Sequence, residues 1–455
     1  MNLYNIHIKE ILGNRYDFSY VLYKYNTLNF HYPTITLSRL LKSKPQYGAA
    51  EAGVIRESLD VTRYIRITDI TENGELSDDI GVTAKTINGK YILNNNDILI
   101  ARSGNTVGKS YIHKSDRISY PCFFAGYMIR FIVDEERINP DYFFIYTQLT
   151  IFKDWVKATQ RTTGQPNINA EEYGGLQIPL PPIGIQQKIV DIYTAAQTAK
   201  LQKDKEAKEL LESIDNYLLE ALSINPSQEV SSESVFTKKI SEMIGNRLDV
   251  SFYKDRFEMV SGIYPNKRLS SIVDIDPTIR FTGLADDTPI SFIPMECIDD
   301  TFGEVKVQRE TTIAKTKGYT KFEENDLLWA KITPCMQNGK SAIARNLTNG
   351  VGCGSTEYYV IRPKTDDLII DYVYLVLRHH AVLKAAQNSF GGSAGQQRVS
   401  SQYVKSIVIP HPPIDVLKSI IATVIQKKER AKQLQSEGSK VLEEAKATIE
   451  KMILG

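Results

Sequence analysis

The stretch "NDILIARSGNTVGKS" (Asn96 to Ser110) runs from an apolar segment into a loop of Gly, Asn, Lys and Ser. That loop is close to the phosphate-binding loop of ATPases, in which Gly, four residues and Gly-Lys-Ser lie between a strand and a helix. Here only three residues separate Gly104 from Gly108, and Lys109 and Ser110 follow. Two interpretations arise: a shortened nucleotide loop, or a turn that uses the same residue types for another purpose.

The chain repeats itself at a spacing of about 230 residues. Four segments recur in the same order: "LGNRYDFSY" at Leu12 as "IGNRLDVSF" at Ile244, "NDILIAR" at Asn96 as "NDLLWAK" at Asn325, "GKSYI" at Gly108 as "GKSAI" at Gly339, and "IPLPP" at Ile178 as "IPHPP" at Ile409. This spacing is far longer than that of a solenoid repeat. The pattern predicts two homologous domains.

The repeat bears on the opening loop. Its second copy, "AKITPCMQNGKSAI", keeps Gly339, Lys340 and Ser341 but has lost the first Gly. In the first copy the residues after Ser110 alternate like a strand and soon meet Pro121, so they predict no helix N-terminus to hold a phosphate. A polar loop between two strands is the favoured interpretation, and a nucleotide-binding protein is the less favoured alternative.

Composition limits the classes of protein. The 455 residues are 42% hydrophobic and 24% charged, with a formal net charge of +1, which is ordinary for a globular protein but shows no general basic character. The start of the chain lacks the pattern of a secretory signal, no apolar run is long enough to cross a bilayer, and the four cysteines are scattered. We expect a cytoplasmic protein with reduced thiols.

Each copy closes with Ile-Pro-x-Pro-Pro and about 40 residues without Pro. In the second copy, positions from Leu417 to Met452 alternate at spacings of four and three, including Ile421, Gln435 and Ala445. This is a heptad pattern with a polar middle. We predict two long helices, 183–222 and 414–455, packed as an antiparallel coiled coil that places the two globular domains at opposite ends of one rod.

The globular parts are predicted to be mixed α/β. Strands are expected at Tyr64–Ile70, 96–102 and Gly126–Val133, and at the matching segments of the second copy. Helices are expected at Asn139–Ala158 and Ile370–Ala386. The predicted domains are residues 1–182 and 240–413, with the Ser-, Pro- and Glu-containing linker 223–239 after the first long helix.

No catalytic motif emerges. The chain has neither a Gly-x-Ser-x-Gly elbow nor a His-Glu-x-x-His pair, and "IPLPP" lacks the polar and aromatic ends of the adenine methyltransferase motif. We therefore predict no catalytic residue, no metal site and no cofactor.

Two loops in each copy gather side chains that suit nucleic acid. Arg and Lys fit guanine edges and phosphates, and Asn and Gln fit adenine edges. The candidate DNA-binding residues are Arg102, Asn105, Lys109, Arg161, Gln165, Asn167, Lys331, Gln337, Asn338, Lys340, Gln396, Gln397 and Arg398.

These features together resemble the specificity subunit of a Type I restriction–modification enzyme. The segments "NDILIARSGNTVGKS" and "IPLPPIGIQQKIV" are similar to that family's recognition-domain loop and helix entry, whereas "IPHPPIDVLKSII" departs at Asp415 to Leu417, where a Glu-Gln pair is more usual. The resemblance covers essentially the whole chain.

The resemblance implies a non-catalytic reader of double-stranded DNA. Each target recognition domain would read one half of a bipartite target. The long helices would set the gap and dock two DNA adenine methyltransferase subunits that carry S-adenosylmethionine, and motor–nuclease subunits would join for cleavage. A related Type II-like enzyme, in which the partner fuses methyltransferase and nuclease, remains an alternative.

Overall fold

The structure is a computed structural model, and it describes residues 28–77, 79–160, 165–224, 257–390 and 397–454. The chain divides into two units. Unit 1 comprises Met1–Asp204 and Gln435–Gly455, and unit 2 comprises Lys205–Leu434. Each long helix therefore contributes to both units.

Unit 1 contains two four-stranded sheets and a two-stranded ribbon. The first sheet has the order β2 (Gln46–Tyr47), β9 (Met128–Phe131), β6 (Ile98–Ala101) and β7 (Ser110–Ile112), with all pairs antiparallel. The second has the order β3 (Gly53–Ile55), β5 (Val82–Ala84), β4 (Arg63–Ile65) and β8 (Cys122–Phe124), with β4 and β8 parallel. Strands β1 (Thr34–Thr36) and β10 (Gln177–Pro179) form the ribbon.

Unit 2 repeats the first sheet and the ribbon of unit 1, but its parallel pair lies in the middle of the second sheet instead of at its edge. Its first sheet has the order β12 (Val273–Ile275), β19 (Tyr358–Pro363), β16 (Leu327–Ala330) and β17 (Ser341–Ile343). Its second has the order β14 (Arg309–Thr312), β13 (Pro289–Ile293), β18 (Val351–Gly354) and β15 (Thr320–Glu323), with β13 and β18 parallel. The ribbon pairs β11 (Asn266–Arg268) with β20 (Val408–Pro410).

The Asn-Asp pair that opens the repeated motif has the same structural role in both units. Asn96 and Asn325 turn the chain with positive φ angles of 69° and 68°, which Asn tolerates better than most residues. The following Asp97 and Asp326 are buried and accept hydrogen bonds from backbone N–H groups just before them and from arginines on β9 and β19. The motif therefore fixes the start of the central strand and ties it to its neighbour.

The polar loop after this strand is a connection between antiparallel strands. Strand β7 begins at Ser110 and pairs with β6, and strand β17 begins at Ser341 and pairs with β16. The Gly-Lys-Ser residues thus lead into a strand in both units, which removes the helix N-terminus that a nucleotide loop uses.

The expected strand at Tyr64–Ile70 is shorter than predicted. Strand β4 ends at Ile65, and a 3-10 turn spans Ile67–Asp69. Asp69 causes the change because its carboxylate accepts hydrogen bonds from the Arg66 backbone and side chain. This local bonding competes with the sheet.

Each of the two predicted helices is broken into two. In unit 1, α2 (Pro140–Gln148) and α3 (Thr150–Thr159) meet at Leu149, and in unit 2, α8 (Ile370–Arg378) and α9 (His380–Gln387) meet at His379. The junction residues have extended ψ angles of 158° and 131°. The short helices α4 (Ala170–Gly174), α7 (Leu269–Ile272) and α10 (Ser401–Ser406) complete the units.

A carboxylate from a long helix caps each second half. Glu450 accepts hydrogen bonds from the backbone N–H groups of Thr150 and Ile151 in unit 1. Asp215 accepts from the backbone N–H of His380 at 2.8 Å in unit 2. Helix N-termini leave such donors without intrahelical partners, so an anionic side chain stabilises them. These capping hydrogen bonds thus connect each globular part to a long helix.

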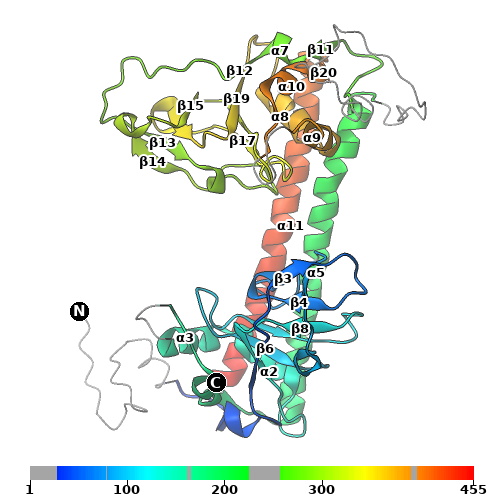
Figure 1. Cartoon of the computed structure of the whole chain (residues 1–455), viewed down its shortest axis with the longest axis vertical. Helices are drawn as coiled ribbons and strands as arrows, with labels where there is room; N and C mark the ends of the chain where they lie inside the picture. Colours follow the sequence, from blue (N-terminus) through cyan, green and yellow to red (C-terminus); the bar gives the residue numbers. More distant parts are fainter. Residues whose placement is uncertain (1–27, 78, 161–164, 225–256, 391–396, 455) are drawn as a thin grey trace. The chain divides into compact units, whose positions relative to one another are not determined.

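The long helices are α5 (Ile183–Ala221) and α11 (Ile414–Leu454). In unit 1, the Lys203 ammonium lies 2.6 Å from the Glu437 carboxylate. In unit 2, Lys427 donates to Ser213 at 2.9 Å, while Leu218 and Leu222 share a core with Leu417. In unit 1 the contacts also include Gly438 against Lys200. As residue numbers rise along α5 they therefore fall along α11 in both units, so the helices are antiparallel within each unit. Figure 1 shows the red end of α11 beside α2 and α3, and its orange end beside α8 and α9.

The seam of α11 follows the predicted spacing with three shifts by one residue. Ile420, Leu434 and Ile453 are buried where Ile421, Gln435 and Met452 were expected. A straight helix drifts from a strict heptad repeat, which accounts for such shifts. The predicted fold class, two α/β domains with two long antiparallel helices, is confirmed.

Some predicted features lie outside the described residues. These are the repeated segments 12–20 and 244–252, most of the linker 223–239, and the candidate residues Arg161 and Gln396. No described helix is both long and apolar enough to cross a membrane.

Candidate nucleic-acid interface

In unit 1 the two candidate loops are paired through their backbones. The Gly104 N–H donates to the Pro166 carbonyl at 3.0 Å, and the Ile168 N–H donates to the Arg102 carbonyl at 2.9 Å. Ser103 and Asn167 form an isolated antiparallel bridge between these bonds. The pairing brings the candidates Arg102, Asn105, Gln165 and Asn167 to one place.

Unit 2 pairs its loops in the same way. The Thr333 N–H donates to the Gln397 carbonyl at 3.0 Å, and the Val399 N–H donates to the Lys331 carbonyl at 3.0 Å. Ile332 and Arg398 form the isolated bridge. The candidates Lys331, Gln397 and Arg398 are thereby held together, and Gln337 and Asn338 are exposed within the longer loop.

Arg102 is positioned by an aromatic ring and a carbonyl. Its Nε donates to the Gly126 carbonyl at 3.1 Å, and its guanidinium carbon lies 5.0 Å from the centre of the Tyr47 ring. Tyr47 is 41% exposed and Tyr127 is 63% exposed. Because the Arg102 N–H also donates to the Tyr127 carbonyl, both tyrosines lie next to the paired loops.

Sequence reasoning did not nominate these two tyrosines, which lie beside the paired loops. Exposed aromatic rings can stack on bases or on sugar faces. Nothing in the local pattern distinguishes Tyr47 or Tyr127 from the many buried tyrosines of the chain, since their exposure depends on strand pairing between distant segments.

The lysines of the Gly-Lys-Ser segments have partners within the protein. The Lys109 ammonium lies 3.2 Å from the Glu72 carboxylate, and its side chain is only 15% exposed. The Lys340 ammonium donates to the Met295 carbonyl at 3.4 Å. These two candidates are therefore held differently from Arg102 and Arg398.

A polar cluster lies under the first loop. The Ser110 and Thr147 hydroxyls are 2.6 Å apart, and the Gln148 amide donates to Ser110 at 2.6 Å. All three residues are buried. With Lys109 and part of α3 they line a cavity of about 420 Å³. The cluster anchors the loop to α2, so its Gly-Lys-Ser residues have a structural role in this unit.

Arg398 in unit 2 makes a two-pronged ion pair. Its Nε and Nη2 donate to the two Glu357 carboxylate oxygens at 2.9 and 2.7 Å. These hydrogen bonds, with the nearby positive charges of Arg398 and Lys331, hold the pKa of Glu357 below its usual range. The pair stays charged at neutral pH and fixes the orientation of the guanidinium of an arginine whose side chain is 42% exposed.

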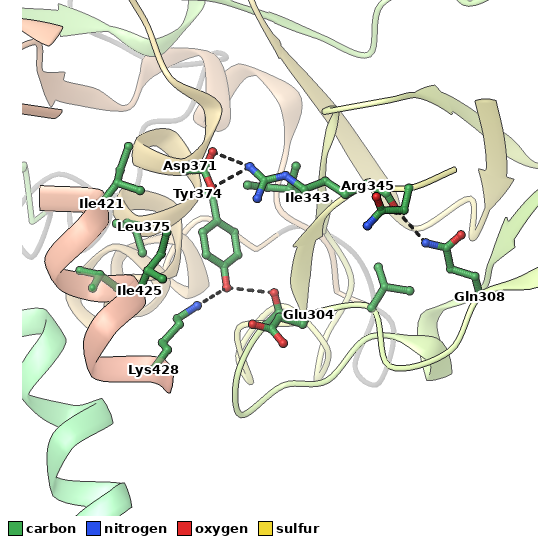
Figure 2. Close-up of a pocket in the computed structure, with 14 residues that line it drawn as sticks. Glu304, Gln308, Ile343, Arg345, Asp371, Tyr374, Leu375, Ile421, Ile425 and Lys428 are labelled. Atoms are coloured by element: carbon green, nitrogen blue, oxygen red, sulfur yellow. Dashed lines mark hydrogen bonds and ion pairs between the residues drawn. The ribbon is translucent and has the colours of Figure 1, made fainter. Parts of the chain in front are cut away.

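Unit 2 contains a cavity of about 330 Å³ where α8 meets α11 (Figure 2). The Tyr374 hydroxyl donates to the carbonyls of the loop at Phe302 and Gly303 and accepts from Lys428 of α11 at 2.8 Å. Burial lowers the pKa of Lys428 to about 8. On another wall Arg345 pairs with Asp371 at 2.6 Å.

The corresponding junction in unit 1 uses neutral and acidic groups. The Gln197 amide on α5 donates to the Glu75 carboxylate at 2.9 Å, and burial raises the pKa of Glu75. In both units a loop that connects two strands of the second sheet therefore docks onto a long helix. The contacts are polar in each case, but the charges differ.

The family model and the curated relatives that match this chain point to the same protein family. The family model described as "Type I restriction modification DNA specificity domain" matches residues 51–213 and 266–444, well over half of the chain. The chain is 38% identical over 156 residues to the specificity subunit of the Type I restriction enzyme EcoEI and 33% identical over 208 residues to that of EcoAI, both from Escherichia coli. These matches cover 34% and 45% of this chain but only 26% and 34% of the relatives.

Two solved structures align with nearly the whole chain at low identity. The S subunit of a Type I restriction–modification system from M. genitalium aligns over 94% of this chain and 97% of its own, with a TM-score of 0.40 and 10% identity. A chain from a study of assembly in a type I R-M system aligns over 93% of this chain and 96% of its own, with a TM-score of 0.44 and 14% identity. On the family match, which extends through both units, the chain belongs to the Type I restriction–modification DNA specificity domain family.

Proposed function

We propose that this chain is the DNA-reading subunit of a Type I restriction–modification complex. The main support for the proposal is the pair of loop sites. Both units use the same backbone pairing between loops, but the side chains on these loops differ. Two such sites in one chain suit a bipartite target whose halves need not be palindromic.

The readers are proposed to be the exposed or partly exposed polar residues of the paired loops. Arg and Lys recognise guanine edges and phosphates, and Asn and Gln recognise adenine edges. The proposed contacts in the first domain are Arg102, Asn105, Gln165 and Asn167, and those in the second are Lys331, Gln337, Asn338, Gln397 and Arg398. Lys109 and Lys340 are proposed to act mainly on loop shape, because each already has a partner.

The chain is proposed to be non-catalytic and to act with partner subunits. Two adenine methyltransferase subunits would dock on the long helices and supply S-adenosylmethionine chemistry, and motor–nuclease subunits would add cleavage. The near-neutral charge supports this division, since phosphate contacts give much of the affinity for DNA. The isolated chain should bind DNA weakly, and the complex should bind tightly and with strong dependence on salt.

The direct test is to map methylated adenines in cells that carry this chain with its methyltransferase partner. The proposal expects one bipartite motif with a fixed gap, which disappears when the chain is deleted. A contiguous motif would contradict it, as would methylation that persists without the chain. The partner that co-purifies separates the Type I assignment, with separate methyltransferase and nuclease chains, from a fused Type II-like partner.

The helices are proposed to set the gap between the half-sites. Removing the heptad 198–204 together with its antiparallel partner 435–441 shortens both helices by about 10 Å and keeps Gln197 and Lys428, which dock the two domains. We expect the gap to shrink by about three base pairs while both half-sites are retained, because duplex DNA rises about 3.4 Å per base pair. The motif is read again by methylation mapping, and an unchanged gap would rule out the role of the helices as a spacer.

A further inference from the structure

The second domain contains an arginine whose side chain and backbone are both held in place. Glu357 holds the Arg398 guanidinium through two hydrogen bonds of 2.9 and 2.7 Å. The backbone at Arg398 is bridged to Ile332, and the next residue donates to Lys331. The side chain is still 42% exposed. An exposed arginine that is held this firmly has lost much of the entropy that binding would otherwise remove.

Glu357 is itself fixed by its surroundings. Its N–H donates to the Ser355 hydroxyl at 3.2 Å, and its carbonyl accepts from the Lys331 N–H at 2.9 Å. The Lys331 backbone therefore links Glu357 to Val399, the residue after Arg398, and the Lys331 ammonium lies 5.1 Å from the centre of the Tyr359 ring. The Tyr359 hydroxyl donates to the Val399 carbonyl at 2.8 Å, which completes the support.

A guanidinium carries five N–H donors in a planar fork. It can hold a carboxylate along its Nε edge and present donors from its outer end to a second group. The guanine edge in the major groove offers O6 and N7, two acceptors that match such an end, and this is the commonest specific arginine contact with DNA.

We propose that Arg398 reads a guanine in the half-site of the second domain and that Glu357 is its positioning residue. This inference rests on the proposed function of the chain. It goes beyond that function because it assigns a base to one named side chain and a role to a carboxylate outside the candidate set.

Among the described residues of the first domain, the equivalent places hold no such pair. The residues that occupy the equivalent places are Asn167, at the backbone bridge, and Tyr127, whose carbonyl accepts from Arg102 as the Glu357 carbonyl accepts from Lys331. Neither can form an arginine–carboxylate pair. The inference therefore applies to one half-site only, and this restriction makes it testable within a single molecule.

The first experiment maps methylated adenines in cells that carry the partner methyltransferase and either the unaltered chain, Arg398→Ala or Glu357→Gln. The matched control is Arg345→Lys, because Arg345 also pairs with a carboxylate on the surface of unit 2 but lies outside the paired loops. We expect Arg398→Ala to lose the preference for guanine at one position of one half-site by about tenfold or more. Glu357→Gln should relax the same position less, and the control should keep the motif.

The second experiment measures binding of the purified complex to its target with 7-deazaguanine at that position, which removes the N7 acceptor. The unaltered complex should bind this DNA about tenfold more weakly than normal DNA, and the Arg398→Ala complex should bind both equally. If Arg398→Ala abolishes methylation altogether, the purified variant complex still gives this comparison. The inference fails if the Arg398→Ala complex requires every base of the motif as strictly as the unaltered complex does. It also fails if the Arg398→Ala complex loses as much affinity for the 7-deazaguanine DNA as the unaltered complex. Failure of the proposed function is distinct, because the unaltered chain would then give no bipartite motif.

Discussion

The paired loops of the two units share a backbone and differ in their side chains. In each unit a segment after the central strand is bonded to a segment before a short helix, with an isolated bridge between two hydrogen bonds. At the bridge, unit 1 has Ser103 and Asn167, and unit 2 has Ile332 and Arg398. The contrast separates the residues that build the site from those that can give it specificity.

The building residues are the buried ones that recur. Asp97 and Asp326 have equivalent partners in the two copies. The residues that break the equivalent helices, Leu149 and His379, are buried in both copies but differ in type. The exposed residues around Arg102 and Arg398 do not match. Under the proposed function, a scaffold of this kind would let one domain change its specificity without changing the other.

The largest effect on stability is expected at the scaffold aspartates. Asp97→Ala should lower the free energy of unfolding by about 3–5 kcal/mol, because it leaves the buried Arg130 without its carboxylate. Asp326→Ala should cost less, because Arg362 keeps Glu323 at 2.7 Å. Chemical denaturation measures the free energy of unfolding of both variants. Equal decreases would show that Glu323 does not compensate for the loss of Asp326.

The next effect concerns the junction with the long helices and depends on pH. Lys428→Gln gives the second unit the residue found at the equivalent position of the first, Gln197. Folding lowers the pKa of Lys428 from 10.5 to about 8, so between these values the unfolded chain binds more protons than the folded one. Stability contributed by this group therefore rises with pH across that window.

Relative to the variant, the unaltered protein should gain up to about 3 kcal/mol between pH 8 and pH 10.5. Below pH 8 the cost of burying the charge is fully present, and the difference between the two proteins should be constant. The measurement is the difference in unfolding free energy at pH 7.5 and at pH 10. A difference that does not change with pH would mean that Lys428 is not buried at the junction.

The smallest effect distinguishes two cations of one loop. Arg102→Ala should weaken binding of the assembled complex to its target by about tenfold, because a base contact of this kind is worth 1–3 kcal/mol. Lys109→Ala should weaken it less than about threefold, since Lys109 already pairs with Glu72 and such partly exposed pairs contribute little. Both affinities are measured at one salt concentration. A larger loss for Lys109→Ala would place that lysine against DNA.

Much of the architecture could be predicted from the sequence because the chain contains its own comparison. The repeated "ND" segments, the Ile-Pro-x-Pro-Pro entries and the heptad spacing are local signals, and they predicted the domains and the long helices. The pairing of the loops could be predicted from the sequence only in part. Both loops contain polar residues of the right type, but no local signal says that the Gly104 region bonds to the Pro166 region.

Other features depended on distant partners. The helix breaks at Leu149 and His379 contain neither Pro nor Gly, and the carboxylate that caps the second half comes from a long helix far away in the chain. The direction of Lys109 depends on Glu72, and the pairing of Arg398 depends on Glu357. Side-chain type is visible in a sequence, but orientation and engagement depend on tertiary contacts.

The central claim is that each domain reads one half of the target independently. The most direct test exchanges residues 1–182 for those of a relative with a different target and maps methylated adenines in cells that carry the hybrid chain and the partner methyltransferase. The account predicts that one half-site changes while the other half-site and the gap remain. A change in both half-sites, or in neither, would contradict it.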